Sequence, residues 1–440
     1  MTRPRGSLLA AGAVVIAIVA SVSAAGRAGV AQRFDGFTAF TNANVIDVGT
    51  SEALRAVPGT IVVRAGRVVR IAPQGTTPPA DARVVDLAGQ FVVPGFVNAH
   101  AHISDVQGLK PRAYTDENAR RQLALYARYG ITTVLSLGGE QAPAFALRDS
   151  QNDPTLDRAR IFLSGEIVTA RTPEEARQVV ARVAATKPDI IKIRVDDNLG
   201  STTKMAPEVY RAVIDESHKL GLRVAAHIFY LDDAKELLRA GVDMIAHSVR
   251  DRDLDDETIT LLKARNVPYC PTLTREISVF AYEMTPKFFS DPFFLKEADR
   301  DVMAQLQQSA RMQAMAASSS AQRYKAGLVV AMRNLKKAAD AGVTVVMGTD
   351  TGAAPERFQG YFEHLEMQMM AEAGLSPAQV LRASTVNAAA SALRRDDVGR
   401  LATGRWADFV ALRENPLVDV RRTQSISSVW IAGNPVPAAR

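Results

Sequence analysis

Four glycines separate helical segments from short apolar runs in the middle of this 440-residue chain, and this alternation constrains the fold most. Each glycine follows a stretch of helical pattern and directly precedes an extended apolar run, at Gly130, Gly221, Gly241 and Gly342. Glycine is common after a helix because it lacks the Cβ that makes left-handed backbone costly. The repeated order of helix and strand predicts a parallel sheet with helices packed on it.

Eight segments have the composition of buried strands: Phe96–His102, Thr132–Leu137, Arg160–Gly165, Ile190–Val195, Val224–Phe229, Met244–Val249, Val267–Leu273 and Val343–Asp350. Eight parallel strands with intervening helices are typical of a (β/α)8, or TIM, barrel. An open doubly wound sheet is the alternative, but no glycine-rich phosphate loop follows any of these strands. We therefore predict an α/β fold with a (β/α)8 barrel over residues 93–397.

Both ends of the chain contain short strands and turns. Residues 38–92 alternate apolar and polar positions between Gly, Pro and Asp breakers, with a hairpin expected at Ala65-Gly66. Residues 398–436 show the same pattern of short apolar runs between turn residues. Neither piece is long enough to form a stable sheet alone. We predict a small β-sandwich domain built from both pieces.

The connection between the seventh and eighth predicted strands is far longer than a usual loop. Residues 297–341 have a helical pattern, and a Pro-interrupted stretch rich in phenylalanine precedes them. Residues 275–325 can form a lid over the site, or they can pack as an inserted helical segment against the barrel. The sequence leaves both alternatives open.

The N-terminal segment is typical of an export signal. Arg3 and Arg5 precede the apolar stretch Leu8–Val22, and small residues follow it. We expect residues 1–31 to be a signal peptide and the protein to be periplasmic or secreted. An uncleaved membrane anchor is the alternative, because the uncharged stretch is marginally long enough to span a bilayer.

The composition excludes some functions. A single cysteine, Cys270, excludes an intrachain disulfide framework. The net charge is +6, of which half comes from three arginines in the N-terminal segment, and no basic patch with interleaved aromatic residues is present. We therefore do not expect nucleic-acid binding. We expect a small-molecule substrate and a homo-oligomer.

Four of the six histidines and one aspartate lie near the ends of predicted strands, at His100, His102, His227, His247 and Asp350. Side chains two residues apart on a strand share one face, so His100 and His102 would both point into the barrel near its catalytic mouth. A single buried histidine is usually a hydrogen-bonded core residue. Four of them with an aspartate, on different strands of one barrel, predict a metal site.

Lys192 lies in an apolar strand, where an unpaired ammonium would be costly. Burial favours the neutral amine, which can add carbon dioxide and become a carboxylated lysine that bridges two metal ions. An ion pair with Asp189 or Asp196 is the alternative.

Three motifs carry a family resemblance. The segment 93–102 reads VPGFVNAHAH, residues 348–351 read GTDT, and residues 399–408 lead back toward the C-terminal strands. On these motifs the chain resembles the amidohydrolase superfamily, in its imidazolonepropionase-like and prolidase-like branch, over roughly residues 40–436.

This resemblance implies a binuclear centre with two divalent ions, expected to be zinc. His100 and His102 would bind one ion with Asp350, His227 and His247 would bind the second, and carboxylated Lys192 would bridge them. A metal-bridging hydroxide would attack the substrate, and Asp350 would move its proton to the leaving amine. The implied reaction is hydrolysis of an amide or peptide-type C–N bond, in a dipeptide or an N-acyl amino acid.

The chain departs from this branch at positions that contact substrate. Prolidase-like members often have a tyrosine two residues after the fifth-strand histidine, where this chain has Phe229 followed by Tyr230. The arginine-aspartate pair common at the end of the second strand is missing as well. We predict Tyr230, Arg194 and Arg275 as replacement substrate-binding residues.

Three further residues receive structural interpretations. His364 follows the eighth strand on a helix and is expected to pack there rather than to bind metal. His218 lies on a polar helix and is expected to be exposed. Cys270 is expected to be a core residue.

Other functions are compatible with the same residues. A mononuclear heterocycle deaminase would use the histidines and the aspartate but would leave Lys192 without a role. A lactone or phosphotriester hydrolase would use the same binuclear centre. A non-catalytic protein that binds a metal or a small molecule is a further alternative. Loss of a metal-coordinating residue would favour it, but none of these residues is missing.

Overall fold

The computed structural model describes residues 36–49, 54–110 and 114–438. The predicted signal peptide, residues 1–31, lies outside the described residues. No helix in the described part of the chain is both long enough and apolar enough to cross a membrane.

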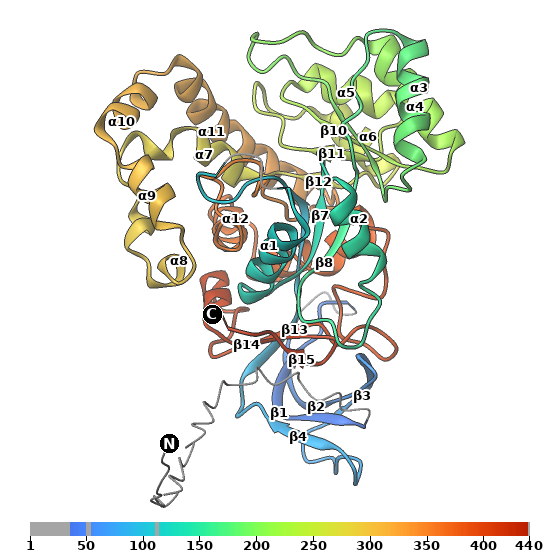
Figure 1. Ribbon diagram of the computed structural model, residues 1–440, viewed down its shortest axis with the longest axis vertical. Coiled ribbons are helices and arrows are strands. Elements are labelled where there is room, and N and C mark those ends of the chain that lie inside the picture. Colours follow the sequence, from blue (N-terminus) through green and yellow to red (C-terminus); the bar gives the residue numbers. More distant parts are fainter. Residues whose placement is uncertain (1–35, 50–53, 111–113, 439–440) are drawn as a thin grey trace, which may run out of the picture. The chain divides into compact units, whose positions relative to one another are not determined.

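Strands from both ends of the chain form one eight-stranded sheet. Its strands are β1 (Thr38–Ile46), β2 (Ala56–Arg64), β3 (Arg67–Pro73), β4 (Arg83–Asp86), β5 (Phe91–Pro94), β13 (Phe409–Leu412), β14 (Ile426–Ile431) and β15 (Asn434–Pro435). The order is β15-β14-β13-β5-β1-β2-β3, with β4 paired to β1. The blue and red strands therefore lie together in Figure 1. The predicted hairpin is confirmed, since β2 and β3 are antiparallel and both Ala65 and Gly66 have positive φ.

A buried ion pair joins this sheet to a strand from the middle of the chain. Arg160 begins β8 (Arg160–Leu163), and its Nε donates to Asp408 Oδ2 at 2.8 Å just before β13. The Arg160 guanidinium lies 3.9 Å from the ring centroid of Trp406. Asp408 Oδ1 also accepts a hydrogen bond from the backbone N–H of Ala432 at 2.7 Å.

Replacing Asp408 by alanine is expected to lower the free energy of unfolding by about 3–5 kcal/mol, because it leaves a buried guanidinium without its partner. Urea unfolding would measure the effect. Asp253 is a suitable control because it pairs with Arg333 on the surface, and Asp253→Ala should change stability little. Equal effects of both substitutions would contradict a structural role of the buried pair.

Among the residues described in the middle of the chain, seven parallel strands form two sheets. One sheet has the order β6-β7-β8 and the other β12-β11-β10-β9. Besides β8, these strands are β6 (Phe96–Ala101), β7 (Ile131–Ser136), β9 (Ile191–Arg194), β10 (Val224–His227), β11 (Met244–Ala246) and β12 (Tyr269–Cys270). The predicted α/β class is confirmed.

The eighth predicted strand, Val343–Asp350, is not a regular strand, and this part of the prediction is wrong. Its backbone forms only isolated parallel bridges, Tyr269 with Val345 on one side and Ala101 with Thr351 on the other. Asp350 has a φ of 63°, which interrupts extended geometry. A third bridge pairs Val168, in the segment after β8, with Ile193 of β9. Closure into a (β/α)8 barrel stays a prediction that these bridges support.

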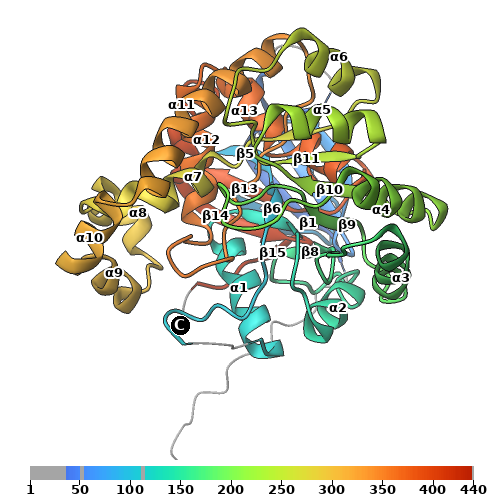
Figure 2. The ribbon, with the colours of Figure 1, turned by 90° about the horizontal axis from the view of Figure 1, so that it is seen from above.

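Helices surround the central strands in the view of Figure 2. Their bounds are α1 (Asp116–Arg128), α2 (Ala142–Asp149), α3 (Pro173–Ala184), α4 (Pro207–Lys219), α5 (Leu231–Ala240), α6 (Asp256–Ala264), α7 (Leu273–Phe280), α8 (Pro292–Leu295), α9 (Arg300–Leu306), α10 (Ser309–Ala316), α11 (Ser319–Asp340), α12 (Tyr361–Glu372) and α13 (Pro377–Ala383). Short turns of other helix types are η1 (Ala281–Glu283), η2 (Lys287–Ser290), η3 (Ala388–Ala392) and η4 (Val420–Gln424). The four glycines that separate helix from strand all have positive φ, as predicted.

The inserted segment between β12 and Val343 packs through its aromatic residues. The Phe288 ring lies 5.5 Å from that of Tyr361 on α12, and the Phe294 ring lies 4.9 Å from that of Phe358. Phe289 and Phe294 are both buried. Of the two alternatives for this segment, these contacts agree with packing against α12 and the residues that precede it.

Candidate metal centre

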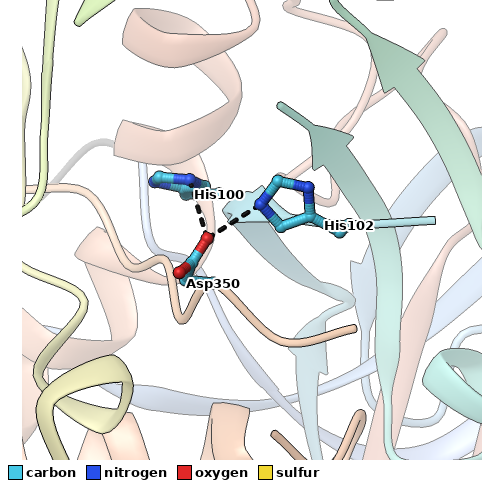
Figure 3. Close-up of side chains that lie close together, drawn as sticks. All are labelled: His100, His102 and Asp350. Carbon is cyan, nitrogen blue, oxygen red and sulfur yellow. Dashed lines mark hydrogen bonds and ion pairs between the residues drawn. The ribbon is translucent and has the colours of Figure 1, made fainter. Parts of the chain in front are cut away.

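Three predicted ligands meet at the ends of β6 and of the segment Val343–Asp350. Asp350 Oδ1 lies 2.8 Å from His102 Nε2 and 3.2 Å from His100 Nε2, as Figure 3 shows. The ligand atoms of the three residues all lie within 4.8 Å of one another. Two imidazoles and one carboxylate in this arrangement can hold a divalent metal ion.

A buried polar network fixes the backbone under these ligands. Asn98 Oδ1 accepts from the backbone N–H of His100 at 2.9 Å, and Asn98 Nδ2 donates to Glu363 on α12 at 2.7 Å. The hydroxyls of Thr349 and Thr351 donate to the same carboxylate, at 2.9 and 2.6 Å. Glu363 therefore connects both ligand-bearing segments, which is the role that outer partners have at metal sites.

The Asp350 carboxylate is held ionised by its surroundings. Burial alone would raise its pKa, but the charge of Arg357 and hydrogen bonds to His100 and His102 keep the pKa well below its ordinary value. Arg357 Nη1 forms an ion pair with Asp350 Oδ2. Burial lowers the pKa of His100 to about 3. A neutral imidazole beside an ionised carboxylate is the state in which both bind metal.

Lys192 lies directly beside this cluster. Its Nζ is 3.4 Å from His100 Nε2, and the residue is only 3% exposed. Burial lowers the pKa of the Lys192 amine to about 8. The alternative ion pairs are absent from the described residues, because Asp189 pairs with Arg148 and Asp196 pairs with Arg194 and His227.

His227 and His247 lie next to the cluster with their rings in contact. The ring centroids of His227 and His247 are 4.1 Å apart, and those of His100 and His247 are 4.5 Å apart. His227 Nε2 lies 3.0 Å from Asp196 Oδ2, and His247 Nδ1 lies 2.6 Å from Thr272 Oγ1. The structure thus brings all six predicted ligands to one place, although only three of them form a closely spaced ligand set.

The three predicted substrate-binding residues differ in their surroundings. The Tyr230 hydroxyl donates to Asp197 at 2.9 Å. Arg194 is exposed and pairs with Asp196 at 2.9 Å. Arg275 is buried, pairs with Glu276 at 3.3 Å, and donates to the Tyr324 hydroxyl at 3.3 Å. Their roles stay predictions.

The remaining predicted residues lie away from the cluster. His364 is buried and lies within hydrogen-bond distance of the Tyr129 carbonyl and the Thr423 hydroxyl, as a packing residue should. His218 is exposed and lies 2.8 Å from Asp243 Oδ2. Cys270 is buried in the core.

Sequence reasoning missed several residues that hold the site. Arg357 gave no signal, because it lies in an irregular loop seven residues after Asp350. Asp196 was considered only as a possible ion-pair partner of Lys192, and its contact with His227 was not predicted. Glu363 could have been noticed because it directly precedes His364 on the helix that follows Asp350.

A cluster of two histidines and one aspartate that could hold a metal ion lies at the end of β6 and of the segment Val343–Asp350. Comparison with known families identifies the class of protein. A model of the Amidohydrolase family matches residues 91–436. The chain belongs to this family. The superfamily predicted from the sequence is confirmed, and with it the prediction of a hydrolase-type enzyme family.

Individual relatives are distant. Ochratoxinase of Aspergillus niger is 26% identical over 282 residues, which are 61% of this chain and 51% of that protein. The chain thus spans about half the length of this first curated relative. Imidazolonepropionase of Streptomyces coelicolor is 26% identical over 373 residues, covering 80% of this chain and 84% of that protein. A solved structure of a Xaa-Pro dipeptidase with bound methionine has a TM-score of 0.73 at 21% identity, covering 91% of this chain and 99% of the other, and shows a shared fold.

Proposed function

We propose that this protein is a metal-dependent hydrolase of amide or peptide-type C–N bonds, acting on a dipeptide or an N-acyl amino acid. The observation that carries the proposal is the convergence of His100, His102 and Asp350 within 4.8 Å. Membership of the amidohydrolase family supports the reaction class. The proposed scaffold is a (β/α)8 barrel over residues 93–397, with a β-sandwich domain from residues 38–92 and 398–436.

The donor set fits a divalent metal ion. Two imidazoles and an ionised carboxylate are present. The proposed ligands are His100, His102, Asp350, His227, His247 and carboxylated Lys192. Bound divalent ions, proposed to be two zinc ions, would lower the pKa of water and polarise a substrate carbonyl. His100 and His102 lie two residues apart at the end of β6. The backbone of His100 is held by Asn98, which Glu363 holds in turn.

Asp350 is placed to move the proton of the reaction. Its carboxylate is ionised, so it can accept a proton from the attacking water and return it to the leaving nitrogen. Its Oδ2 is held by Arg357, which keeps the carboxylate from rotating. Without a proton the departing nitrogen would be a strongly basic amide anion, so this transfer makes C–N cleavage feasible.

Lys192 supports the binuclear form of the proposal. The amine is buried and next to His100, and it has no carboxylate partner among the described residues. A carboxylated Lys192 would add an anionic bidentate ligand between the two histidine pairs. The proposal of N6-carboxylation rests on this placement together with the lowered pKa of the amine.

Metal content tests the proposal directly. We expect about two divalent ions per chain in protein purified without chelator and analysed by plasma mass spectrometry. Chelator treatment should remove activity toward dipeptides and N-acyl amino acids, and zinc should restore it. One ion per chain would contradict the bridging role of Lys192, and full activity after complete metal removal would contradict the hydrolytic mechanism.

Location and assembly are proposed from the sequence. We propose that residues 1–31 direct export to the periplasm or outside the cell. We also propose that the protein is a homo-oligomer and that it acts on a small-molecule substrate. Mass determination of the mature protein from an exporting host would show whether the segment is removed.

A further inference from the structure

Helix α7 begins at a residue that contacts the candidate ligand His247. Thr272 directly precedes Leu273, the first residue of α7, and its hydroxyl oxygen lies 2.6 Å from His247 Nδ1. Both Thr272 and His247 are buried. A hydroxyl that accepts the Nδ1 proton fixes the plane of the imidazole and leaves Nε2 free to bind a metal ion. The position of Thr272 therefore decides how His247 faces the cluster.

Thr272 does not cap its own helix, unlike two other threonines in the equivalent position. Thr115 and Thr172 precede α1 and α3 with extended backbone, and each hydroxyl accepts a hydrogen bond from the backbone N–H three residues later. This is the ordinary role of threonine before a helix. Thr272 instead has a φ of 48° and a ψ of 50°, and its side chain makes no hydrogen bond to the first turn of α7. Left-handed backbone is costly for a β-branched residue, so other contacts must hold Thr272 in place.

The side chain of Glu366 on α12 caps α7 in place of the Thr272 hydroxyl. Its Oε1 accepts a hydrogen bond from the backbone N–H of Leu273 at 2.8 Å, and its Oε2 accepts one from the backbone N–H of Thr274 at 2.7 Å. The Thr274 hydroxyl also donates to Oε2, at 2.7 Å. The first N–H groups of a helix have no partner within the helix, and negative charge is favourable beside them. Glu366 therefore fixes the two residues that directly follow Thr272.

This contact requires a carboxylate. Glu366 is 0% exposed, and it forms no ion pair with any described residue, so the three hydrogen bonds offset the cost of burying its charge. A glutamine would have one acceptor oxygen at its end and one donor nitrogen. It could accept a hydrogen bond from Leu273 or from Thr274 but would place its amide group against the other N–H. Glu366→Gln should therefore release one side of the helix start.

We propose that Glu366 is a positioning residue for His247: by capping α7 from α12, it releases the Thr272 hydroxyl to hold the imidazole. This inference rests on the proposed metal-dependent function and concerns the second pair of histidine ligands. The same helix supports the other ligands, because Glu363, three residues earlier, holds the backbone of the ligand cluster. Helix α12 thus connects both halves of the proposed centre.

Zinc titration of the full chain tests this inference. The titration is done in a calorimeter with chelator-treated protein at pH 8, above the pKa of about 7 to which burial raises the Glu366 carboxyl. Wild type should bind about two ions per chain, and Glu366→Gln should bind one of them at least about 10-fold more weakly. Glu372→Gln is the matched control, because Glu372 is exposed on the same helix, and it should bind zinc as wild type does.

Substitutions of Thr272 show whether Glu366 acts through this residue. Thr272→Val keeps the branched side chain but removes the hydroxyl, and it should weaken the same ion. Thr272→Ser keeps the hydroxyl and should retain most of the affinity. If both residues act on His247 in series, Glu366→Gln combined with Thr272→Val should weaken zinc binding no more than the larger single effect. A combined loss equal to the product of the two single losses would overturn the inference.

A measurement without metal separates this inference from the proposed function. Nitrogen-15 NMR of metal-free protein reports which ring nitrogen of His247 carries the proton, and the spectrum of His247→Gln identifies its signals. Wild type should be protonated at Nδ1 alone, and Glu366→Gln should show a mixture of both tautomers. This result would support the inference even if wild type bound fewer than two ions, which would contradict only the binuclear function.

Two results would overturn the inference. One is a wild-type spectrum with the His247 proton on Nε2. The other is a folded Glu366→Gln protein with unchanged tautomer and unchanged zinc affinity, which would make Glu366 a helix cap and nothing more. If Glu366→Gln does not fold, Thr274→Val takes its place, because it removes one of the three hydrogen bonds to Glu366 and should weaken the same ion.

Discussion

Replacing Asp350 by asparagine is expected to reduce kcat by at least about a thousandfold, because it would remove the proposed metal ligand and the proposed proton acceptor together. Asparagine preserves the shape of the side chain but carries no negative charge. The two imidazoles at 2.8 and 3.2 Å would lose their shared carboxylate, and Arg357 would lose its ion-pair partner. Both kcat and bound metal would be measured, and we expect metal content to fall as well.

The control for this substitution is Asp253→Asn, which changes a surface ion pair with Arg333 and should leave kcat and metal content unchanged. Circular dichroism and thermal unfolding would show that Asp350→Asn still folds. An Asp350→Asn protein that retains its metal and most of its activity would show that another group accepts the proton.

Lys192→Ala is expected to abolish hydrolysis and to lower metal content from about two ions to about one. The substitution removes the only amine in contact with His100 among the described residues. Short carboxylic acids such as acetate or propionate should restore part of the activity, because the space vacated by the lysine can hold a carboxylate in place of the carbamate. Full activity in Lys192→Ala would rule out the bridging role.

Lys192→Met gives a readout that does not depend on activity. In chelator-treated protein at pH 7, both the folded and unfolded forms carry a charged lysine, and the buried ammonium destabilises the folded form. Since the pKa falls from 10.5 to about 8, the methionine variant should be more stable, by about 3 kcal/mol. The advantage should shrink as the pH rises from about 8 toward 10.5, because the folded protein then sheds the proton. Urea unfolding at pH 7 and 9.5 would measure this trend.

Local sequence signals determined the α/β class of the fold and the candidate metal ligands. Glycines such as Gly241 identify helix ends because only a residue without Cβ adopts left-handed backbone at low cost. The alternation of side chains along a strand places His100 and His102 on the same face regardless of distant contacts. These features depend on neighbouring residues, so they could be predicted from the sequence.

The backbone conformation of the segment Val343–Asp350 could not be predicted from its local sequence. Its apolar composition predicts a strand, but a Cβ at Gly348 would lie 2.4 Å from Cys270 Sγ and 2.8 Å from His100 Cβ. Asp350 adopts positive φ in the same segment. The backbone conformation there is set by contacts with residues remote in sequence, which no local pattern encodes.

The sequence by itself determined which residues could bind metal, because their type and their position at strand ends are local properties. Only the tertiary structure decided how they are held: Glu363 on α12 fixes Asn98 and Thr349, Arg357 pairs with Asp350, and Asp196 and Thr272 orient His227 and His247. The aromatic insert was likewise assigned to packing by its contacts with α12. These contacts depend on which residues the fold brings close together in space. A charged residue in an irregular loop belongs to no periodic sequence pattern, so its contacts cannot be predicted from its neighbours in the sequence.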